Sequence, residues 1–481
     1  MNVLLLALST IPSDKLNCYE YQYENEEKFS GYYQLEPIPK FLNEKLRKEK
    51  NQKIDYIITL NTSEVENFEF KEVSCNKEDN TQFHFENITA KKLFEELLLE
   101  GDKAFMELPS IISIDIEVNN IIPGVVEAID KLRTLKNEKG PFDLYIDIHG
   151  GPRNTQMTFQ TILSLLKHES IYPKSIYTVI VNKGGSCTIK DETEYFEYID
   201  FVVGMNEFLD FGKTINLEGK YLSNDKDLKR FTEIANSIAG ALTLCDMEGF
   251  KSKLENMSTW IDKNQAIDSP LLRLFIENIQ SDYGKLLDID HYVIDEIEWC
   301  LKKGYLQQAM TLIESKMPKE LYDQGIFTYE DSDEIDDCKN DWESRENYIF
   351  IKLIYSLNIN PYDQKGNLRA IYLNKDRKYY TSNLFKYSRP RIRSYVKLRK
   401  KAKAQKWNED SYTNIQVSLK KDDENVIRLL LLHYALKQER NKTNHAANDS
   451  SDNITNTGRY NSKDIENAIG GYVDLAKKIY K

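Results

Sequence analysis

The hydrophobic pattern of the chain changes once, near residue 221, and this change divides it into parts of different fold class. Before residue 221, short apolar runs alternate with segments of helical periodicity. Most of the runs are continuously apolar, which is typical of strands covered on both faces of a parallel sheet. We expect strands at residues 3–8, 54–60, 111–116, 144–148, 176–181 and 201–203.

Helical patterns at residues 122–135 and 155–167 lie between these strands. Strand-helix alternation predicts a doubly wound, Rossmann-like α/β domain over residues 1–215. In such a domain the ligand site lies beyond the carboxyl ends of the strands.

After residue 221 the pattern is helical, and it predicts an all-α region without a strand series. We divide this region into a helical connector, 216–320, and a C-terminal helical domain, 321–481, and we expect an acidic, mobile loop at 325–345. The expected helices are residues 227–242, 246–261, 270–283, 292–303, 306–317, 426–436 and 462–480.

Charge is unevenly distributed along the chain. The net charge of −12 argues against broad, nonspecific coating of nucleic acid, which needs a basic footprint. Residues 329–337 are acidic and 389–406 are basic, and either run can be a solvated surface. The basic run contains Tyr395 and is followed by Trp407, so it is also a candidate RNA-contacting surface.

Cysteine spacing and hydropathy indicate where such a chain works. The six cysteines form no C-x-x-C pair, which argues against a zinc site or a disulfide framework and for a reducing compartment. No apolar run reaches the length of a membrane span, and residues 1–8 lack the basic start and cleavage site of a secretion signal. We therefore expect a cytoplasmic protein with no bound metal and no membrane partner.

Residues 144–154 read LYIDIHGGPRN, a buried strand that runs through a glycine turn into a helix. Gly150 and Gly151 let the backbone approach a ligand closely, and the helix that follows offers unpaired N–H groups to phosphate. His149 and Arg153 can add hydrogen-bond donors. The pattern is not G-x-G-x-x-G, so a dinucleotide cofactor is not expected. The alternative is an ordinary tight turn between strand and helix.

Near the C-terminus, Arg440 and His445 follow an apolar helix in the pattern R-N-x-x-N-H. On a continuous helix these positions lie about 140° apart, so they share a face only if the helix ends or bends between them. Asn441 and Asn444 favour such an end. Arginine can hold a phosphate and histidine can transfer a proton at neutral pH. The alternative is a helix end with basic residues that favour its dipole.

Taken together, these motifs resemble two families of domain. The strand ends at 7–10, 147–150 with Arg153, and 181–185 resemble the CARF sensor domains of type III CRISPR effectors. The R-x4-6-H pattern resembles HEPN ribonucleases, and residues 294–316 (IDEIEWCLKKGYLQQAMTLIESK) are similar to a helical segment of CARF–HEPN proteins. Ile148 and Gly151-Pro152 depart from the commoner T/S-H-G/S-F-R pattern, which leaves the ring size of the ligand open.

The resemblance implies a homodimeric ribonuclease that cleaves single-stranded RNA without a metal or cofactor. Its activator would be cyclic tetra- or hexa-adenylate, made by a type III CRISPR complex. Catalysis would be carried by Arg440 and His445, with Asn441 holding the phosphate or the loop. The activator would be bound by residues Ser9, Thr10, His149, Gly150, Gly151, Arg153 and Lys183.

Three alternatives remain open from the sequence. The chain can be a regulator that binds cyclic oligoadenylate and whose helical half only interacts with partners. It can be a ring nuclease that degrades its own ligand near His149 or Lys183. It can also be a HEPN-class toxin unrelated to CRISPR.

Overall fold

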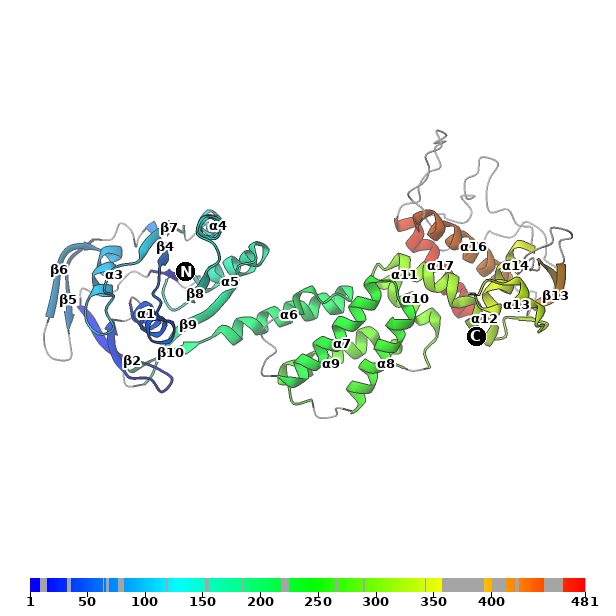
Figure 1. The fold of residues 1–481 in the computed structure, drawn as a ribbon, viewed down its shortest axis with the longest axis horizontal. Coiled ribbons are helices and arrows are strands. Elements are labelled where there is room, and N and C mark those ends of the chain that lie inside the picture. Colours follow the sequence, from blue (N-terminus) through cyan, green and yellow to red (C-terminus); the bar gives the residue numbers. More distant parts are fainter. Residues whose placement is uncertain are drawn as a thin grey trace, which may run out of the picture. The chain divides into compact units, whose positions relative to one another are not determined.

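The computed structural model divides the chain into two compact units, Met1–Ile199 and Asp200–Lys481, with the boundary inside helix α6 (Thr193–Phe211) (Figure 1). The sequence-based division at residue 215 remains a prediction. The structure describes residues 1–8, 15–32, 36–63, 65, 69–76, 82–117, 120–151, 155–183, 186–217, 225–263, 267–288, 290–341, 343–356, 393–399, 412–419, 424–444 and 462–480.

The first unit is built on a ten-stranded sheet in the order β6-β5-β2-β10-β9-β8-β1-β4-β7, with β3 paired to β2. The strands are β1 (Asn2–Ala7), β2 (Lys15–Tyr23), β3 (Phe29–Tyr32), β4 (Tyr56–Asn61), β5 (Glu69–Asn76), β6 (Gln82–Thr89), β7 (Ser110–Asp115), β8 (Asp143–Asp147), β9 (Pro173–Val181) and β10 (Ser186–Asp191).

Five parallel strands, β9-β8-β1-β4-β7, form the centre of this sheet. All six residues of β1 are buried, as expected for a continuously apolar strand with neighbours on both sides. Val3 pairs with Tyr56 of β4 and with Leu144 of β8. The five strands expected between residues 3 and 181 are thereby confirmed.

Helices cover both faces of the central strands. One core joins alternate residues of the sheet to α4 (Ile122–Lys139) and α5 (Thr155–Leu166). The other joins the intervening residues to α1 (Pro37–Lys50) and α3 (Ala90–Leu99). Successive β1 residues belong to opposite cores, Val3 and Leu5 to the first and Leu4 and Leu6 to the second. The expected α/β class of the N-terminal part is confirmed.

Five strands of this part were not predicted, and one predicted strand is wrong. Strands β2, β3, β5, β6 and β10 were not expected, and they extend the sheet beyond β9 with both parallel and antiparallel pairs. Residues 201–203 are not a strand but part of α6. Phe201, Met205 and Phe208 are buried at helical spacing, whereas Val203 is exposed, so the apolar triplet belongs to a helical stripe.

The second unit is mainly helical, with a single core that joins its helices. The helices expected from 227 to 317, near 426–436 and at 462–480 are confirmed. Among the described residues no helix is both long and apolar enough to cross a membrane. The helices are α7 (Lys226–Thr243), α8 (Met247–Lys263), α9 (Pro270–Tyr283), α10 (Val293–Lys302), α11 (Leu306–Ser315), α12 (Met317–Asp323), α13 (Glu334–Cys338), α14 (Arg345–Ser356), α16 (Glu424–Asn444) and α17 (Ser462–Ile479). Short 3-10 turns are η1 (Lys167–Glu169) in the first unit and η2 (Ile215–Leu217) and η4 (Gly284–Leu287) in the second.

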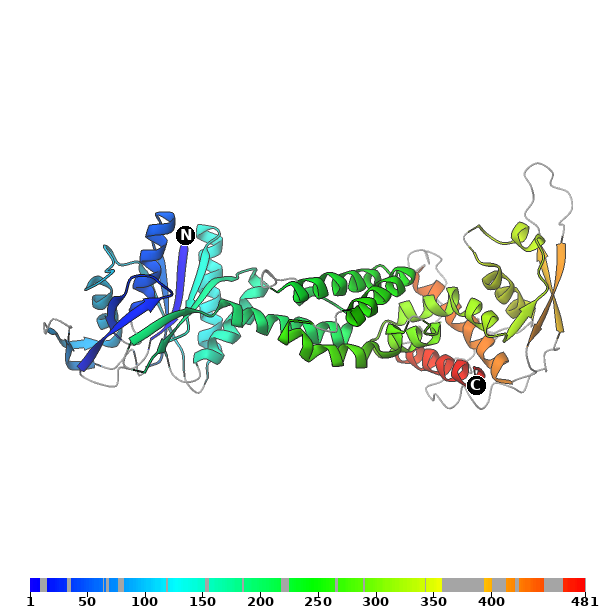
Figure 2. The same ribbon diagram turned by 90° about the horizontal axis from the view of Figure 1, so that it is seen from below.

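The C-terminal part is not all-α, which corrects the sequence prediction. Strands β11 (Phe327–Tyr329), β13 (Tyr412–Leu419) and β12 (Arg393–Arg399) form an antiparallel sheet in that order. The strands appear at the edge of the helical unit in Figure 2. Strand β12 falls within the basic run, whose charges hide an alternating pattern typical of a half-buried strand.

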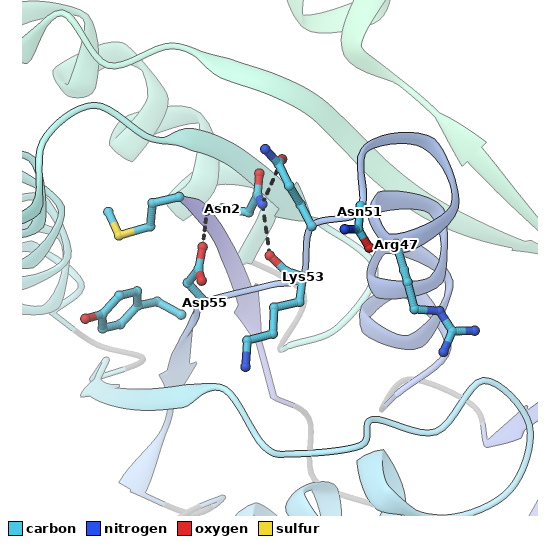
Figure 3. Close-up of a pocket in the computed structure, with 8 residues that line it drawn as sticks. Asn2, Arg47, Asn51, Lys53 and Asp55 are labelled. Atoms are coloured by element: carbon cyan, nitrogen blue, oxygen red, sulfur yellow. Dashed lines mark hydrogen bonds between the residues drawn. The ribbon is translucent and has the colours of Figure 1, made fainter.

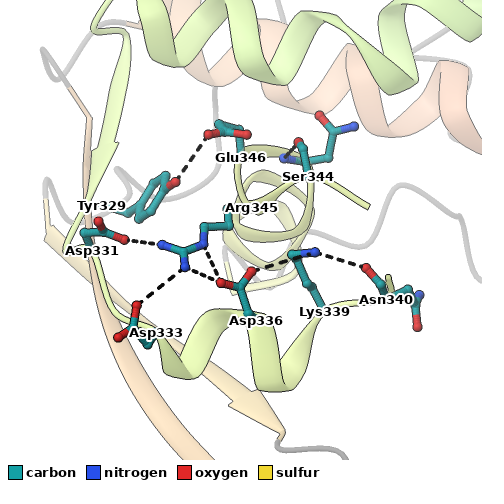
Figure 4. A network of polar contacts seen from close by, with 10 residues as sticks. Tyr329, Asp331, Asp333, Asp336, Lys339, Asn340, Ser344, Arg345 and Glu346 are labelled. Carbon is teal, nitrogen blue, oxygen red and sulfur yellow. Dashed lines mark hydrogen bonds and ion pairs between the residues drawn. The ribbon is translucent and has the colours of Figure 1, made fainter. Parts of the chain in front are cut away.

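The acidic segment 325–345 is not a structureless loop, because it contains β11 and α13. Arg345 joins its carboxylates, with Nη1 2.6 Å from Asp331 Oδ1 and Nε 2.9 Å from Asp336 Oδ2 (Figure 4). These hydrogen bonds hold the pKa of Asp336 below its ordinary value. Ile335 is fully buried and anchors α13 to the core.

Candidate functional site

The order of the central strands determines where a ligand is expected in the first unit. Numbered along the chain, these five strands lie in the order 3-2-1-4-5, so the direction of winding reverses between β1 and β8. In open α/β sheets, ligands bind outside the carboxyl ends of the strands at this reversal. The carboxyl ends here are Ala7 of β1 and Asp147 of β8. Ser9 and Thr10, which follow β1, lie outside the described residues.

The turn after β8 is held by Asp147. This carboxylate is 6% exposed, and its Oδ1 accepts a hydrogen bond from the backbone N–H of His149 at 2.9 Å. Gly150 is buried, and Gly151 has φ +92°, a conformation that favours glycine. The two glycines therefore form the tight turn expected from the sequence. Arg153 lies outside the described residues.

Burial shifts both ionisable groups of this turn toward their neutral forms. It raises the pKa of Asp147 to about 7 and lowers the pKa of His149 to about 4. At neutral pH, His149 is therefore an uncharged imidazole that can donate or accept a hydrogen bond but cannot form an ion pair. The turn offers hydrogen bonds rather than positive charge to a ligand.

Other side chains reach the same edge of the sheet. Lys183 is exposed in the turn between β9 and β10, and β9 lies beside β8. Asn61, fully buried, ends β4 on the other side of β1. The structure thus places His149, Gly150, Gly151 and Lys183 at neighbouring strand ends. Asp147 and Asn61 were not predicted as site residues, although a polar residue that ends an apolar strand was a visible signal.

A separate cavity of about 740 Å³ lies at the opposite edge of the sheet, where β1 and β4 begin (Figure 3). Its polar groups bond mainly to one another: the Asn2 backbone N–H donates to Asp55 Oδ2 at 2.7 Å and Asn2 Nδ2 to Lys53 O at 2.9 Å. No predicted site residue lines it. These bonds join the starts of neighbouring strands, so we assign them a structural role.

The second candidate site lies where α16 packs against α11. Arg440 Nη1 lies 2.5 Å from Glu314 Oε2, and Lys437 Nζ lies 3.0 Å from Glu314 Oε1. Lys437 and Arg440 are three residues apart and therefore lie on the same face of α16. Both cations and Glu314 are largely shielded from solvent, with side chains 18–27% exposed. One carboxylate thus holds two cations on the same face of α16.

The structure describes helix α16 as far as Asn444, and the proposed pairing of Arg440 with His445 requires that the helix end or bend between these two residues. Asn441 is partly buried on α16. His445 lies outside the described residues, so its distance from Arg440 remains a prediction. Glu314 was not predicted, because no local pattern links α11 to a helix that begins more than a hundred residues later.

A second histidine on α16 has a different character. His433 is fully buried, its Nδ1 lies 3.3 Å from Tyr472 Oη, and its ring meets Phe350 edge-on. Burial and nearby Lys437 lower its pKa to about 3. His433 is therefore neutral at physiological pH and packs in the core, which leaves His445 as the candidate for proton transfer.

Comparison with known proteins gives a similarity to solved structures. No protein-family model matches the chain. No curated protein matches it either. Among solved structures, the chain is similar to Enterococcus italicus Csm6 bound to cyclic hexa-2'-fluoro-hexa-dAMP, with 10% identity and a TM-score of 0.37, over 100% of this chain and 94% of that one. A TM-score at this level does not establish a common fold.

Proposed function

We propose that the chain is a CRISPR-associated endoribonuclease that cleaves single-stranded RNA in its helical unit and is activated by cyclic oligoadenylate bound to its first unit. The observation that carries the proposal is the position of Arg440 on α16, where Glu314 of α11 holds its guanidinium. The motif is of the HEPN type, and the strand-end motifs of the first unit are of the CARF type.

The reaction needs no group beyond the side chains named. Arg440 would hold the scissile phosphate and stabilise the charge that develops on it. His445 would assist attack by the ribose 2'-hydroxyl or protonate the departing 5'-oxygen. Asn441 would hold the phosphate or fix the loop. The products would be a 2',3'-cyclic phosphate and a 5'-hydroxyl, formed without a metal ion.

The activator would bind where the winding of the sheet reverses. The glycine turn at 150–151 lets a phosphate or a base approach the backbone, and His149 and Lys183 supply hydrogen bonds at neighbouring strand ends. Ser9, Thr10 and Arg153 complete the proposed set. Cyclic tetra- and hexa-adenylate both fit the chemistry, and a type III CRISPR complex would be their source.

A homodimer is part of the proposal. Large apolar side chains are exposed on the neighbouring helices α4 and α5, among them Ile122, Val126 and Met157. Ile122 and Met157 lie in the first turns of their helices, which follow β7 and β8 at the ligand edge. A second copy would cover this surface and place the same strand ends around a symmetric ring. Activation would then be coupling between the ring and the helical site.

Product analysis tests the proposed chemistry. A 5'-labelled single-stranded RNA should be cut in EDTA when cyclic tetra- or hexa-adenylate is added. The 5' fragments should resist phosphatase until the cyclic phosphate is opened by acid. Fragments with 3'-hydroxyl or 5'-phosphate ends would refute the mechanism.

A further inference from the structure

The three-stranded sheet of the second unit has one face in the core. Phe327, Leu398, Ile415 and Val417 are at most 3% exposed and belong to the core of this unit. Helix α14 packs on this face, since the rings of Phe350 and Phe327 lie 5.2 Å apart. Successive residues of a strand belong to opposite faces, so the intervening register positions form the other face.

The other face is basic and aromatic. On β12 its register positions are Arg393, Tyr395, Lys397 and Arg399. Their partners on β13 are uncharged: Ser418, Gln416, Asn414 and Tyr412. Residues paired across two strands lie on the same face. By register, three basic residues and two tyrosines therefore belong to this face, and neither strand contains an acidic residue, in a chain whose acidic residues outnumber its basic ones by 77 to 65.

Several described side chains of this face are exposed. Tyr412 is 44% exposed, and Asn414 and, on β11, Thr328 are also exposed. Of the nearby acidic groups, Asp331 and Asp336 are paired with Arg345. Exposed Glu330 follows β11 on this face, with its backbone N–H donating to Gln416 O at 3.0 Å, so one carboxylate lies beside the three basic residues. Figure 2 shows helices of the unit on one side of the orange strands. We call residues 393, 395, 397, 399, 412, 414 and 416 the basic sheet face.

We propose that the basic sheet face binds single-stranded RNA, the substrate class of the proposed ribonuclease on which this inference rests. Cations that follow an RNA backbone and aromatic rings on which bases stack are the usual elements of such surfaces. An acidic protein would satisfy the cations but would leave the tyrosines without a specific role. Asn414 and Gln416 can add hydrogen bonds to bases or ribose.

The first experiment removes the three cations. RNA affinity is measured by anisotropy on the full chain with His445→Ala, which separates binding from cleavage, using a fluorescent 20-nucleotide RNA over a range of salt. Arg393→Ala/Lys397→Ala/Arg399→Ala should raise Kd at least tenfold at low salt. It should also reduce the slope of log Kd against log salt concentration by about 2, since each phosphate contact contributes about 0.7 to this slope.

A matched control removes the same charge elsewhere in the same unit. Lys226, Lys229 and Arg230 are exposed on α7, and their replacement by alanine should leave Kd within about threefold and the slope unchanged. Circular dichroism and thermal unfolding of both triple variants verify that they fold.

The second experiment tests stacking. Tyr395→Ala and Tyr412→Ala should each weaken RNA binding about tenfold, whereas Tyr→Phe at either position should retain it, because the ring face is what stacks. A polyglutamate peptide carries charge without bases and should compete poorly. Equal competition by polyglutamate, or wild-type affinity in the alanine variants, would overturn the inference.

The outcomes separate this inference from the proposed function. If the wild type cleaves RNA and the triple variant binds it with unchanged Kd and slope, the sheet inference is wrong and the ribonuclease stands. If the variants lose binding but the wild type never cleaves, the sheet inference stands and the ribonuclease is wrong. If the wild type binds no RNA, both are wrong.

Discussion

The guanidinium of Arg440 is held by the carboxylate of Glu314, Nη1 to Oε2 at 2.5 Å, which joins α16 to the end of α11. Lys437 occupies the other oxygen of the same carboxylate. An arginine held in this way is oriented before a phosphate arrives, so less conformational freedom is lost when RNA binds. Glu314 is therefore a positioning residue in our account, and its removal should affect catalysis more than binding.

Glu314→Gln keeps the size of the side chain but removes the charge that orients Arg440. We expect kcat for RNA cleavage to fall roughly 5- to 100-fold, the range expected when a catalytic group is misplaced, with KM changed less than about threefold. The matched control is Glu298→Gln, which removes a carboxylate that pairs with Lys477 on the surface of the same unit. Equal kcat in the wild type and Glu314→Gln would show that this carboxylate does not position Arg440.

The buried carboxyl of Asp147 should make the first unit less stable as pH rises. Its folded pKa, about 7, lies above its ordinary value of 3.8, so between these values the folded state holds a proton that the unfolded state has lost. The protonated carboxyl of Asp147 contributes its full stabilisation below about pH 4, and this contribution is lost as pH rises through 7. The opposite shift of His149, from 6.5 to about 4, partly offsets it below pH 6.5.

Asp147→Asn isolates this effect. The difference in Tm between the variant and the wild type should increase from pH 5.5 to pH 8 and then level off, because only the wild type loses the proton. Thermal unfolding followed in matched buffers gives the difference. A difference that stays constant across this range would mean that Asp147 is already ionised in the folded protein.

Gly151 should not tolerate a side chain. Its φ of +92° is costly for an L residue, so Gly151→Ala should lower stability by about 1–2 kcal/mol and should weaken activation by distorting the turn. Gly240→Ala is a control with the opposite expected sign, because Gly240 lies within α7 with open space around it and alanine favours helix by about 1 kcal/mol. If Gly151→Ala stabilises the protein, as Gly240→Ala should, then Gly151 does not have the positive φ on which this prediction depends.

Arg153→Ala should raise the concentration of cyclic oligoadenylate needed for half-maximal cleavage by about tenfold or more, the loss expected for one charge-assisted contact. Cleavage at saturating activator should be unchanged, since the helical site is intact. An activation curve that coincides with that of the wild type would mean that the activator binds elsewhere.

The sequence predicted the elements whose pattern is local. Continuous apolar runs identified β1, β4, β7, β8 and β9, because each contributes apolar residues to the cores on both faces of the sheet. Strand β12 was missed because its charges dominate the composition, although Ser394, Val396 and Leu398 alternate with them. The triplet 201–203 was misread because three apolar residues fit a strand and a helix equally well.

Residues of the candidate sites also differ in whether a local sequence pattern reveals them. The glycine turn and the Arg440 pattern are visible in consecutive residues. Glu314 depends on the packing of α11 against α16, and the raised pKa of Asp147 depends on burial by the whole sheet. Such effects arise from tertiary contacts, which one sequence does not specify by local pattern alone.

The most direct test of the central claim is cleavage of a fluorescent single-stranded RNA in EDTA by the wild type and by His445→Ala, each without activator and with cyclic tetra- or hexa-adenylate. We expect cleavage by the wild type that depends on one of the two rings, and none by the variant, which should still dimerise and bind the activator. Equal cleavage by the variant would contradict the proposed active site, and cleavage by the wild type that ignores both rings would contradict the sensor.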